Sequence, residues 1–403
     1  MKKGSFHNEP SIIYLKTKLI NHKPKPLKSF SDAANVQTIH RIYKYSAVFF
    51  QGLTFIYLCS KNISMATIIN TKFSGPYLSA DLPDEVEIES LTPQVTVTIT
   101  INEVEVFSSS YYIYGLKAYV RDLRSIVEAA MLQKDLAIAK FLLTVKDYEN
   151  FTYNTGNVIV IYSHLKSLSG SEQQLTKSFL STRKSALLSR SCPFSLYNYA
   201  VPYKQVYHYC DIYYTIPSSR EIITATYTFG NKQSDTSKII PTDASYAKLQ
   251  ELLAQRNILD ATIHRVYYYL DGREFNIYFT PDTPSDTFQF KGNFNLWETV
   301  CLFGATTSKT EIDRSEAVCG NKVSYYDTTV KVKHEVETSP LTLSEAQFLT
   351  QLFTSHEITR EVSAGVYTPV LITEASPEFT NDNATPIRLK FTWQYADNKE
   401  YID

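Results

Sequence analysis

Apolar and polar residues alternate along most of the chain. In residues 95–101, valine and isoleucine occupy every second position and threonine fills the positions between them. Asn102 and Glu103 suit a turn, and Val104 and Val106 then resume the alternation. A period of two residues places one set of side chains on each face of a strand, so this segment predicts a half-buried β-hairpin.

A helical spacing follows the hairpin. Apolar positions recur every three or four residues between 120 and 131, which predicts an amphipathic helix. Residues 141–145 and 158–162 predict two strands joined through the turn-forming residues 154–156. We therefore expect residues 65–165 to form a first β-rich domain, in which one helix packs on a layer of strands. The apolar stripe of the helix comprises Val120, Leu123, Val127, Ala130 and Met131.

Residues 166–200 differ in composition from their neighbours. They are rich in serine and basic residues, and their apolar residues are scattered rather than periodic. This composition predicts a solvated linker between two domains. A nucleic-acid contact through Arg183, Lys184 and Arg190 is the alternative, but the aromatic residues that would stack on bases are sparse in this segment.

Strand patterns return in residues 201–403, which we expect to form a second β-rich domain. Residues 206–216 and 222–229 are rich in aromatic and β-branched residues and predict strands. A helix is expected near 243–256, after the turn-forming residues 241–243. Its buried face should contain Tyr246, Leu249, Leu252 and Leu253.

An Asp-Gly pair gives the clearest local signal in this domain. Asp271 and Gly272 separate two alternating runs, residues 264–270 and 273–279. Because tight primed turns need positive φ angles, which this pair adopts readily, we expect a two-residue hairpin here. The remaining expected elements are a strand pair within 323–336, a helix near 343–354 with a Thr342/Glu345 capping box, and closing strands at 369–375 and 388–397.

Composition favours strands and interfaces. The chain contains 30 Tyr and 22 Phe but only 12 Gly, and these aromatic residues suit pleated surfaces and large contacts. The expected fold class is therefore β-rich α+β, with two antiparallel-sheet, sandwich-like domains that each have one or two packed helices. The 403 residues include 40 Lys and Arg against 41 Asp and Glu, a formal net charge of -1. This balance argues against nucleic-acid or acidic-membrane binding as a general function.

Charge is distributed unevenly between the first 64 residues and the rest. Residues 1–64 hold ten basic and two acidic residues, a balance of +8, which leaves -9 for the remainder. The apolar run at 47–59 is shorter than the roughly 20 residues that cross a bilayer, and it lies too far along the chain for a secretory signal. We interpret Met65 as the natural start and residues 1–64 as a non-native or disordered leader. A late membrane anchor is the alternative.

The sequence contains no motif for catalysis, a cofactor or a metal. Its glycines form no phosphate-binding loop or dinucleotide fingerprint, and zinc-protease and serine-hydrolase motifs are missing. The acidic run at 81–89 lacks the glycine of a calcium loop, and Cys319 and His334 do not have a ligand spacing. Glu335 and Glu337 share one face of a strand, which suits a solvated edge better than a glycosidase pair. We therefore expect no enzyme activity, no cofactor and no metal.

The cysteines give no disulfide framework. They are odd in number and form no CxxC motif, so we expect free thiols in a reducing compartment. A bond between Cys301 and Cys319 is the alternative, if their strands are adjacent. The five positions are Cys59, Cys192, Cys210, Cys301 and Cys319.

Several longer stretches together resemble a known protein family. They are FQFKGNFNLWETV at 288–300, KTEIDRSEAVCGNKVSYYD at 309–327, EVETSPLTLSEAQFLTQLFTS at 335–355, the earlier YYIYGLKAYVRDLRSIVEAAM, and the closing ITEASPEF and LKFTWQYADNK. In these stretches the chain resembles a group of uncharacterised virion proteins encoded in tailed phages and prophages of gut bacteria. The resemblance covers most of residues 65–403 and none of 1–64. It implies a β-rich, non-catalytic structural component of a phage particle, in the tail or baseplate, that is assembled in the host cytoplasm.

Large aromatic residues in turn-rich sequence are the candidate contact residues. Phe294, Trp297, Tyr325 and Tyr326 offer contact area at low entropy cost, as subunits that assemble with themselves and with other virion proteins require. The alternative for Trp297, and for Trp393, is an ordinary place in the core. A surface carbohydrate-binding module, with exposed tyrosine and tryptophan stacked on sugar rings, is the second function class. We favour assembly because the chain lacks the signal sequence of a secreted binder.

Overall fold

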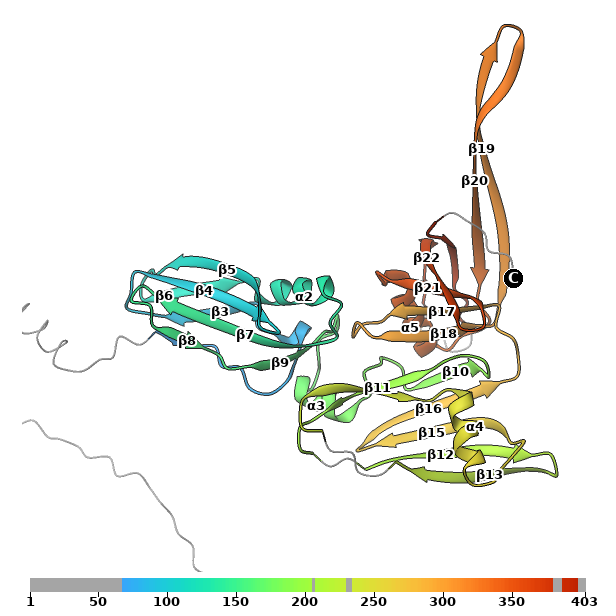
Figure 1. Cartoon of the computed structure of the whole chain (residues 1–403), viewed down its shortest axis with the longest axis horizontal. Coiled ribbons are helices and arrows are strands. Elements are labelled where there is room, and N and C mark those ends of the chain that lie inside the picture. Colours follow the sequence, from blue (N-terminus) through green and yellow to red (C-terminus); the bar gives the residue numbers. More distant parts are fainter. Residues whose placement is uncertain (1–66, 205–206, 230–233, 380–385, 398–403) are drawn as a thin grey trace, which may run out of the picture. The chain divides into compact units, whose positions relative to one another are not determined.

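The computed structural model describes residues 67–204, 207–229, 234–379 and 386–397 (Figure 1). The chain divides into two units, with the boundary after Ser64. The expected leader lies outside the described residues, and its nature stays a prediction.

Strands dominate the described residues, and most of them pair antiparallel. Five sheets are present in this part of the chain, and only two strand pairs within them run parallel. The expectation of a β-rich fold with several antiparallel sheets is therefore confirmed. The four α-helices of the described ranges are α2 (Leu123–Gln133), α3 (Ser171–Lys177), α4 (Tyr246–Ala254) and α5 (Leu343–Thr354).

The first hydrophobic core lies between two sheets and α2. The larger sheet contains β2 (Tyr77–Leu78), β9 (Val158–Ile161), β7 (Ile138–Asp147), β4 (Gln94–Ile101) and β5 (Val104–Tyr112), with β8 (Thr152–Asn154) beside β7, and the smaller contains β1 (Ile68–Ile69), β3 (Glu85–Glu89) and β6 (Lys117–Arg121). The apolar side chains of β4 are buried in this core and its threonines are not, so the predicted hairpin of β4 and β5 is confirmed. Asn102 and Glu103 form its turn, both with positive φ.

The helix of this core begins later than its spacing predicted. Val120 is buried, but it lies in β6, where it pairs with Val86 of β3. Asp122 has a φ of 60° and separates the strand from α2, which begins at Leu123. Val120 fits the period of the helix and that of the strand, so spacing alone could not place the boundary. The other four residues of the predicted stripe are buried in the core.

The segment 166–200 is structured, in contrast to the linker expected from its composition. It contains α3, β10 (Ser185–Ser189) and β11 (Ser195–Ala200), and Leu188 and Phe194 are buried in the second core. β10 pairs in parallel with β16 (Arg273–Thr280), and the register joins Ala186 to Ile277. The apolar residues of 166–200 show no period in the sequence because β10 is short and its pairing partner, β16, is distant along the chain.

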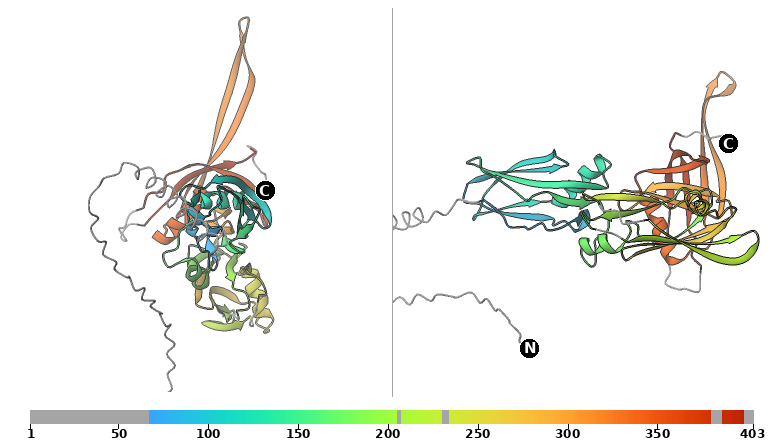
Figure 2. Two further views of the ribbon diagram at one scale, coloured as in Figure 1. Left: turned by 90° about the vertical axis from the view of Figure 1, so that its left-hand side faces the viewer. Right: turned by 60° about the horizontal axis from the view of Figure 1, so that its bottom comes forward.

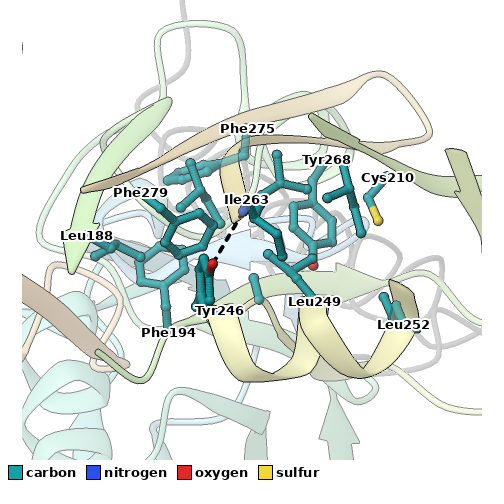
Figure 3. Packing of buried hydrophobic residues seen from close by; sticks show 14 of the residues in the cluster. Leu188, Phe194, Cys210, Tyr246, Leu249, Leu252, Ile263, Tyr268, Phe275 and Phe279 are labelled. Carbon is teal, nitrogen blue, oxygen red and sulfur yellow. Dashed lines mark hydrogen bonds between the residues drawn. The ribbon is translucent and has the colours of Figure 1, made fainter. Parts of the chain in front are cut away.

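The second core lies between a five-stranded sheet and α4. The sheet runs in the order β10, β16, β15 (Thr262–Leu270), β12 (His208–Ile216), β13 (Ser219–Thr228), and β11 pairs separately with β14 (Lys238–Asp243). Figure 3 shows Leu249 of α4 beside the sheet residue Tyr268, and Tyr246 of the same helix pointing towards Ile263. The Tyr246 hydroxyl accepts a hydrogen bond of 3.3 Å from the backbone N–H of Ile263. All four residues predicted for the buried face of this helix are buried.

The Asp-Gly hairpin is confirmed between β15 and β16. Leu270 pairs with Arg273, so the loop has two residues, and Asp271 and Gly272 have φ angles of 46° and 88°. This turn fixes the register in which the two strands present their outer side chains.

The third core lies between a seven-stranded sheet and α5. The sheet runs β18 (Trp297–Leu302), β17 (Asp286–Lys291), β21 (Ile358–Ser363), β22 (Val366–Ala375), β23 (Lys390–Tyr395), β20 (Lys322–Glu337), β19 (Ala305–Cys319). The capping box of Thr342 and Glu345 opens α5 as predicted. Residues 323–336 do not hold a strand pair: they belong to β20 alone, which pairs with β19.

The cysteines differ from the expected set of free thiols. The structure joins Cys192 and Cys301 in a disulfide, whereas Cys210 is free and buried and Cys319 is free and exposed. The alternative pairing of Cys301 with Cys319 is therefore wrong. Cys192 and Cys301 are 109 residues apart and come together only through the fold.

Candidate functional site

β19 and β20 form a long β-hairpin, called the arm below. The two strands pair from Ala305 with Glu337 at the base to Cys319 with Lys322 at the tip. β23 pairs only with residues 334–337 of β20, so the rest of the arm extends beyond its sheet as a two-stranded ribbon (Figures 1 and 2). At the usual rise of about 3.3 Å per residue, residues 322–333 give the ribbon a length of about 40 Å.

The two faces of the arm differ in chemistry. One face continues the buried side of the sheet, and on it Ile312 lies opposite Val330. The other face is charged, and there Lys333 Nζ lies 3.2 Å from Glu311 Oε1. The apolar face comprises Ile312, Val318, Val323, Tyr325 and Val330, which are between 48% and 73% exposed. Arg314 and Glu316 lie on the same face of β19, between Ile312 and Val318. An apolar face of this kind would be buried in an ordinary sheet, but here it is open to solvent.

The base of the arm is anchored in the third core. The His334 ring stacks on the Trp393 ring with centroids 4.0 Å apart, and Ser308 Oγ lies 3.0 Å from His334 Nδ1. Gly304 precedes β19 where the backbone passes close to β20, and a Cβ at this position would overlap the carbonyl oxygen of Glu337. Packing therefore holds the base of the arm, and beyond residue 334 of β20, towards the tip, the arm pairs with no further strand of its own sheet in the described part of the chain.

The structure separates the four candidate contact residues. Tyr325 and Tyr326 lie on the distal half of the arm and are 57% and 71% exposed, and the Arg314 guanidinium lies 4.9 Å from the Tyr325 ring centroid. Phe294 is only 6% exposed and belongs to a small core cluster, so it offers no contact surface. Trp297 is half-buried in β18, with Lys291 Nζ 4.9 Å from its ring centroid. The alternative of a core position is confirmed for Trp393, which is 1% exposed.

A second surface, which sequence reasoning missed, covers the outer face of the five-stranded sheet. Strand pairing places Tyr209 beside Tyr269 in one row, and Tyr213 beside Arg265 in another, with a more polar row between them that pairs Asp211 with Tyr267. We call this surface the tyrosine face; it comprises Tyr207, Tyr209, Tyr213, Tyr267, Tyr269 and Tyr278. The signal was present in the sequence, since alternation in residues 206–216, 264–270 and 273–279 separates these tyrosines from the buried positions.

The rings of the tyrosine face pack against one another. The Tyr209 and Tyr269 rings are stacked with centroids 5.1 Å apart, and Tyr207 lies 5.4 Å from Tyr209. The Arg265 guanidinium lies 5.2 Å from the Tyr213 centroid, and its Nη2 donates a hydrogen bond of 2.6 Å to Asn276 Oδ1. Burial together with the hydrogen bond and charge of Glu274 raises the pKa of Tyr267 to about 12. The face is thus a preformed aromatic surface with internally bonded polar groups.

Charged residues considered from the sequence have structural partners. Arg183 lies 3.2 Å from Glu298, and both side chains are less than a tenth exposed, so Arg183 is not available to bind nucleic acid. In the acidic run 81–89, Glu85 and Asp84 form ion pairs with Arg121 and Arg124. Glu337 at the base of the arm lies 3.0 Å from Lys390.

Metal-binding groups, membrane-spanning helices and pockets bear on other possible functions of the described ranges. Those residues contain no group of three or more His, Cys, Asp or Glu side chains placed to hold a metal ion. None of their helices combines the length and apolar character needed to cross a membrane.

A pocket of about 210 Å³ lies beside the second core, lined in part by Tyr199, His208, Phe229 and Arg273. Arg273 donates there to the backbone carbonyls of Leu175, Ser178 and Tyr199, which identifies it as a structural residue.

Comparison with known proteins adds little to this description. No protein-family model and no curated protein matches the chain. Among solved structures, the chain is similar to fibronectin(III)-like modules of Clostridium thermocellum CbhA, with 8% identity, 53% of this chain and 94% of that chain covered, and a TM-score of 0.16. It is also similar to CBD12 from CALX1.2, with 9% identity, 48% and 76% covered, and a TM-score of 0.15. At these TM-scores no argument about this chain rests on either likeness.

Proposed function

We propose that this protein is a non-catalytic structural subunit that assembles with copies of itself and with other proteins of a tailed-phage particle. The observation that supports this most strongly is the arm, whose apolar face is open to solvent along the ribbon. Assembly subunits need surfaces of this kind, because exposed apolar patches of several hundred Å² in folded proteins usually mark interfaces.

The arm costs free energy unless something covers it. An isolated two-stranded hairpin is at best marginally stable in water, and stable sheets need a third strand or a packed apolar face. The distal arm has neither within its own sheet. Its base is held by His334 and Val336, which are buried. A protein partner that covers the apolar face would stabilise the ribbon, which is the physical reason for assigning assembly to it.

The phage setting of this proposal comes from the sequence resemblance. It implies a place in the tail or baseplate, with host cytoplasm as the site of assembly, and no enzyme activity or cofactor. The sequence predicted two sandwich-like domains, whereas the proposed subunit has three large hydrophobic cores. Residues 82–162 have one core, and residues 179–301 and 288–395 supply two further cores.

Sedimentation velocity tests whether the chain assembles. The full chain at micromolar concentration should sediment as a multimer, and high salt should change the distribution little, because apolar burial is screened far less than charge. The paired substitution Ile312→Thr and Val330→Thr removes apolar surface at exposed arm positions and should shift the distribution towards monomer. A strictly monomeric wild-type chain at all concentrations would contradict the proposal.

Carbohydrate binding is the second candidate function, and the tyrosine face is the observation that favours it. Aromatic rings on a flat sheet can stack on sugar rings, and this face presents six tyrosines. Selective binding of a glycan panel by a monomeric chain, lost on Tyr209→Ala, would support this function over assembly.

A further inference from the structure

We propose that the arm of one copy docks, through its apolar face, on the tyrosine face of a second copy. This inference rests on the proposed function and names the two surfaces that would meet. It assigns a head-to-tail contact, in which different surfaces of the same chain face each other across the interface. Contacts of this type close into rings or extend into filaments, as subunits of a tubular or ring-shaped particle require.

The two surfaces match in size. The apolar stretch of the arm from Val330 to Val323 is about 25 Å long at about 3.3 Å per residue. The tyrosine face extends about 20 Å along β12, from Tyr207 to Tyr213, and about 10 Å across β12, β15 and β16, whose neighbouring strands are about 4.8 Å apart. A two-stranded ribbon laid along β12 can therefore cover this face with most of its apolar stretch in contact.

The apolar face of the arm supplies about half of the area that one partner contributes to a standard interface. If each exposed aliphatic side chain of the arm contributes on the order of 80 Å² and Tyr325 about 100 Å², the apolar face offers roughly 400 Å². The polar margins of the ribbon enlarge this towards the roughly 800 Å² that each partner contributes to a standard interface. Two arms packed face to face could bury a similar area, but the tyrosine face of each copy would then remain uncovered.

Charge is compatible with this pairing. The ribbon, residues 309–333, holds five basic and four acidic residues, a balance of +1. The tyrosine face presents Asp211 and Glu274 against a single basic residue, Arg265, which is bonded to Asn276. A nearly neutral ribbon therefore meets a surface with one carboxylate in excess, so charge does not oppose the contact and supplies little of its strength.

The arrangement of the tyrosines favours a protein over a glycan at this face. Sugar rings need open aromatic faces and free planar hydrogen-bonding groups beside them. Here Tyr209 and Tyr269 cover each other, Asp211 Oδ1 accepts a hydrogen bond of 2.6 Å from Thr226, and Asn276 accepts from Arg265. Aliphatic side chains such as Ile312 and Val330 can pack on ring edges without needing those polar groups.

Cross-linking between two kinds of copy tests the docking directly. The exposed Cys319 at the tip of the arm supplies a reactive thiol, while Cys210 is buried and Cys192 is bonded to Cys301. One variant keeps Cys319, and its partner has Cys319→Ser with Thr228→Cys or Thr224→Cys, exposed positions on the edge strand β13. Both variants have Cys59→Ser. Each copy then has one reactive thiol, so a bismaleimide joins only separate copies, and a size tag on one variant separates mixed dimers from dimers of a single variant. A partner with Glu149→Cys, exposed in a turn of the first domain, serves as the control.

We expect the mixed copies to form a covalent dimer at one of the two β13 positions with a yield at least about tenfold above that at Glu149. Ile312→Lys in the copy that supplies Cys319 should abolish that excess. Multimers that cross-link no better at β13 than at Glu149 would overturn the docking but leave the proposed function intact. A chain that stays monomeric overturns both. Glycan binding that is lost on Tyr209→Ala would assign the tyrosine face to carbohydrate instead.

Discussion

The buried ion pair of Arg183 and Glu298 leads to the sharpest stability prediction. Arg183 lies in a segment whose composition predicts a solvated linker, yet its Nη2 donates to Glu298 Oε2 at 3.2 Å and to the Thr299 carbonyl oxygen at 2.7 Å. Its guanidinium also lies 4.0 Å from the Phe348 ring centroid. If Arg183 were solvated, Arg183→Ala would change stability by less than about 0.5 kcal/mol. The structure predicts a far larger effect.

The expected loss in the free energy of unfolding comes from the buried carboxylate of Glu298, which Arg183→Ala leaves without its partner. Removing one member of a buried pair leaves an uncompensated charge and costs about 3–5 kcal/mol. Replacing both members, with Arg183→Met and Glu298→Leu, removes the charges together and should cost less than Arg183→Met alone. Arg121→Ala breaks an exposed pair with Glu85 and should cost under about 1 kcal/mol, which makes it the matched control.

The same variant should show a defined pH dependence. Burial raises the pKa of Glu298, and the charge of Arg183 opposes that rise. In Arg183→Ala the rise is unopposed, so the folded carboxyl keeps its proton to a higher pH than the unfolded one. A raised folded pKa gives stability that is present at low pH and lost as pH rises. The free energy of unfolding that Arg183→Ala loses relative to the wild type should therefore be smaller near about pH 4.5 than near about pH 7.5.

Urea unfolding, followed by tryptophan fluorescence, measures these effects. The buried Trp393 reports on the third core, to which Phe348 belongs. A loss below about 1 kcal/mol for Arg183→Ala, or a deficit that grows as pH falls, would refute the assignment of a buried pair.

Four further outcomes are expected. Gly272→Val should cost on the order of 1 kcal/mol or more because Gly272 has a φ of 88°, whereas Gly272→Asn should cost less; equal losses in urea unfolding would refute this. Gly304→Ala should destabilise the base of the arm by about 1–3 kcal/mol, since its Cβ would overlap Glu337, and faster proteolysis of the arm would report it. Thr342→Ala should lower stability by about 1 kcal/mol through loss of the α5 cap; an unchanged thermal midpoint would contradict it. Because the raised pKa of Tyr267 favours its protonated form in the folded state, wild-type stability should fall between about pH 10 and about pH 12 more steeply than that of Tyr267→Phe; parallel curves would count against it.

Local patterns in the sequence were sufficient for the elements whose partners are close along the chain. The hairpin of β4 and β5, the Asp271-Gly272 turn and the Thr342/Glu345 capping box all depend on residues within a few positions of one another. Alternation and turn chemistry determine such elements, so they could be read without the fold.

Long-range pairing explains what could not be predicted. β10 is ordered by β16, about 90 residues away, and Arg183 is held by Glu298 and Phe348. These partners cannot be seen in residues 166–200 themselves, whose serine-rich composition therefore predicted a linker. Phe294 and Tyr325 looked equivalent in sequence, but one is buried and the other exposed because only the fold decides which partners each residue meets. The tyrosine face required the register of three strands.

Direct imaging of the full chain tests the central claim, that this protein is an assembling subunit whose arm contacts a neighbouring copy. Electron micrographs of the chain at micromolar concentration should show multi-copy rings or filaments in which no arm projects freely. Isolated single copies with free arms under the same conditions would contradict the claim.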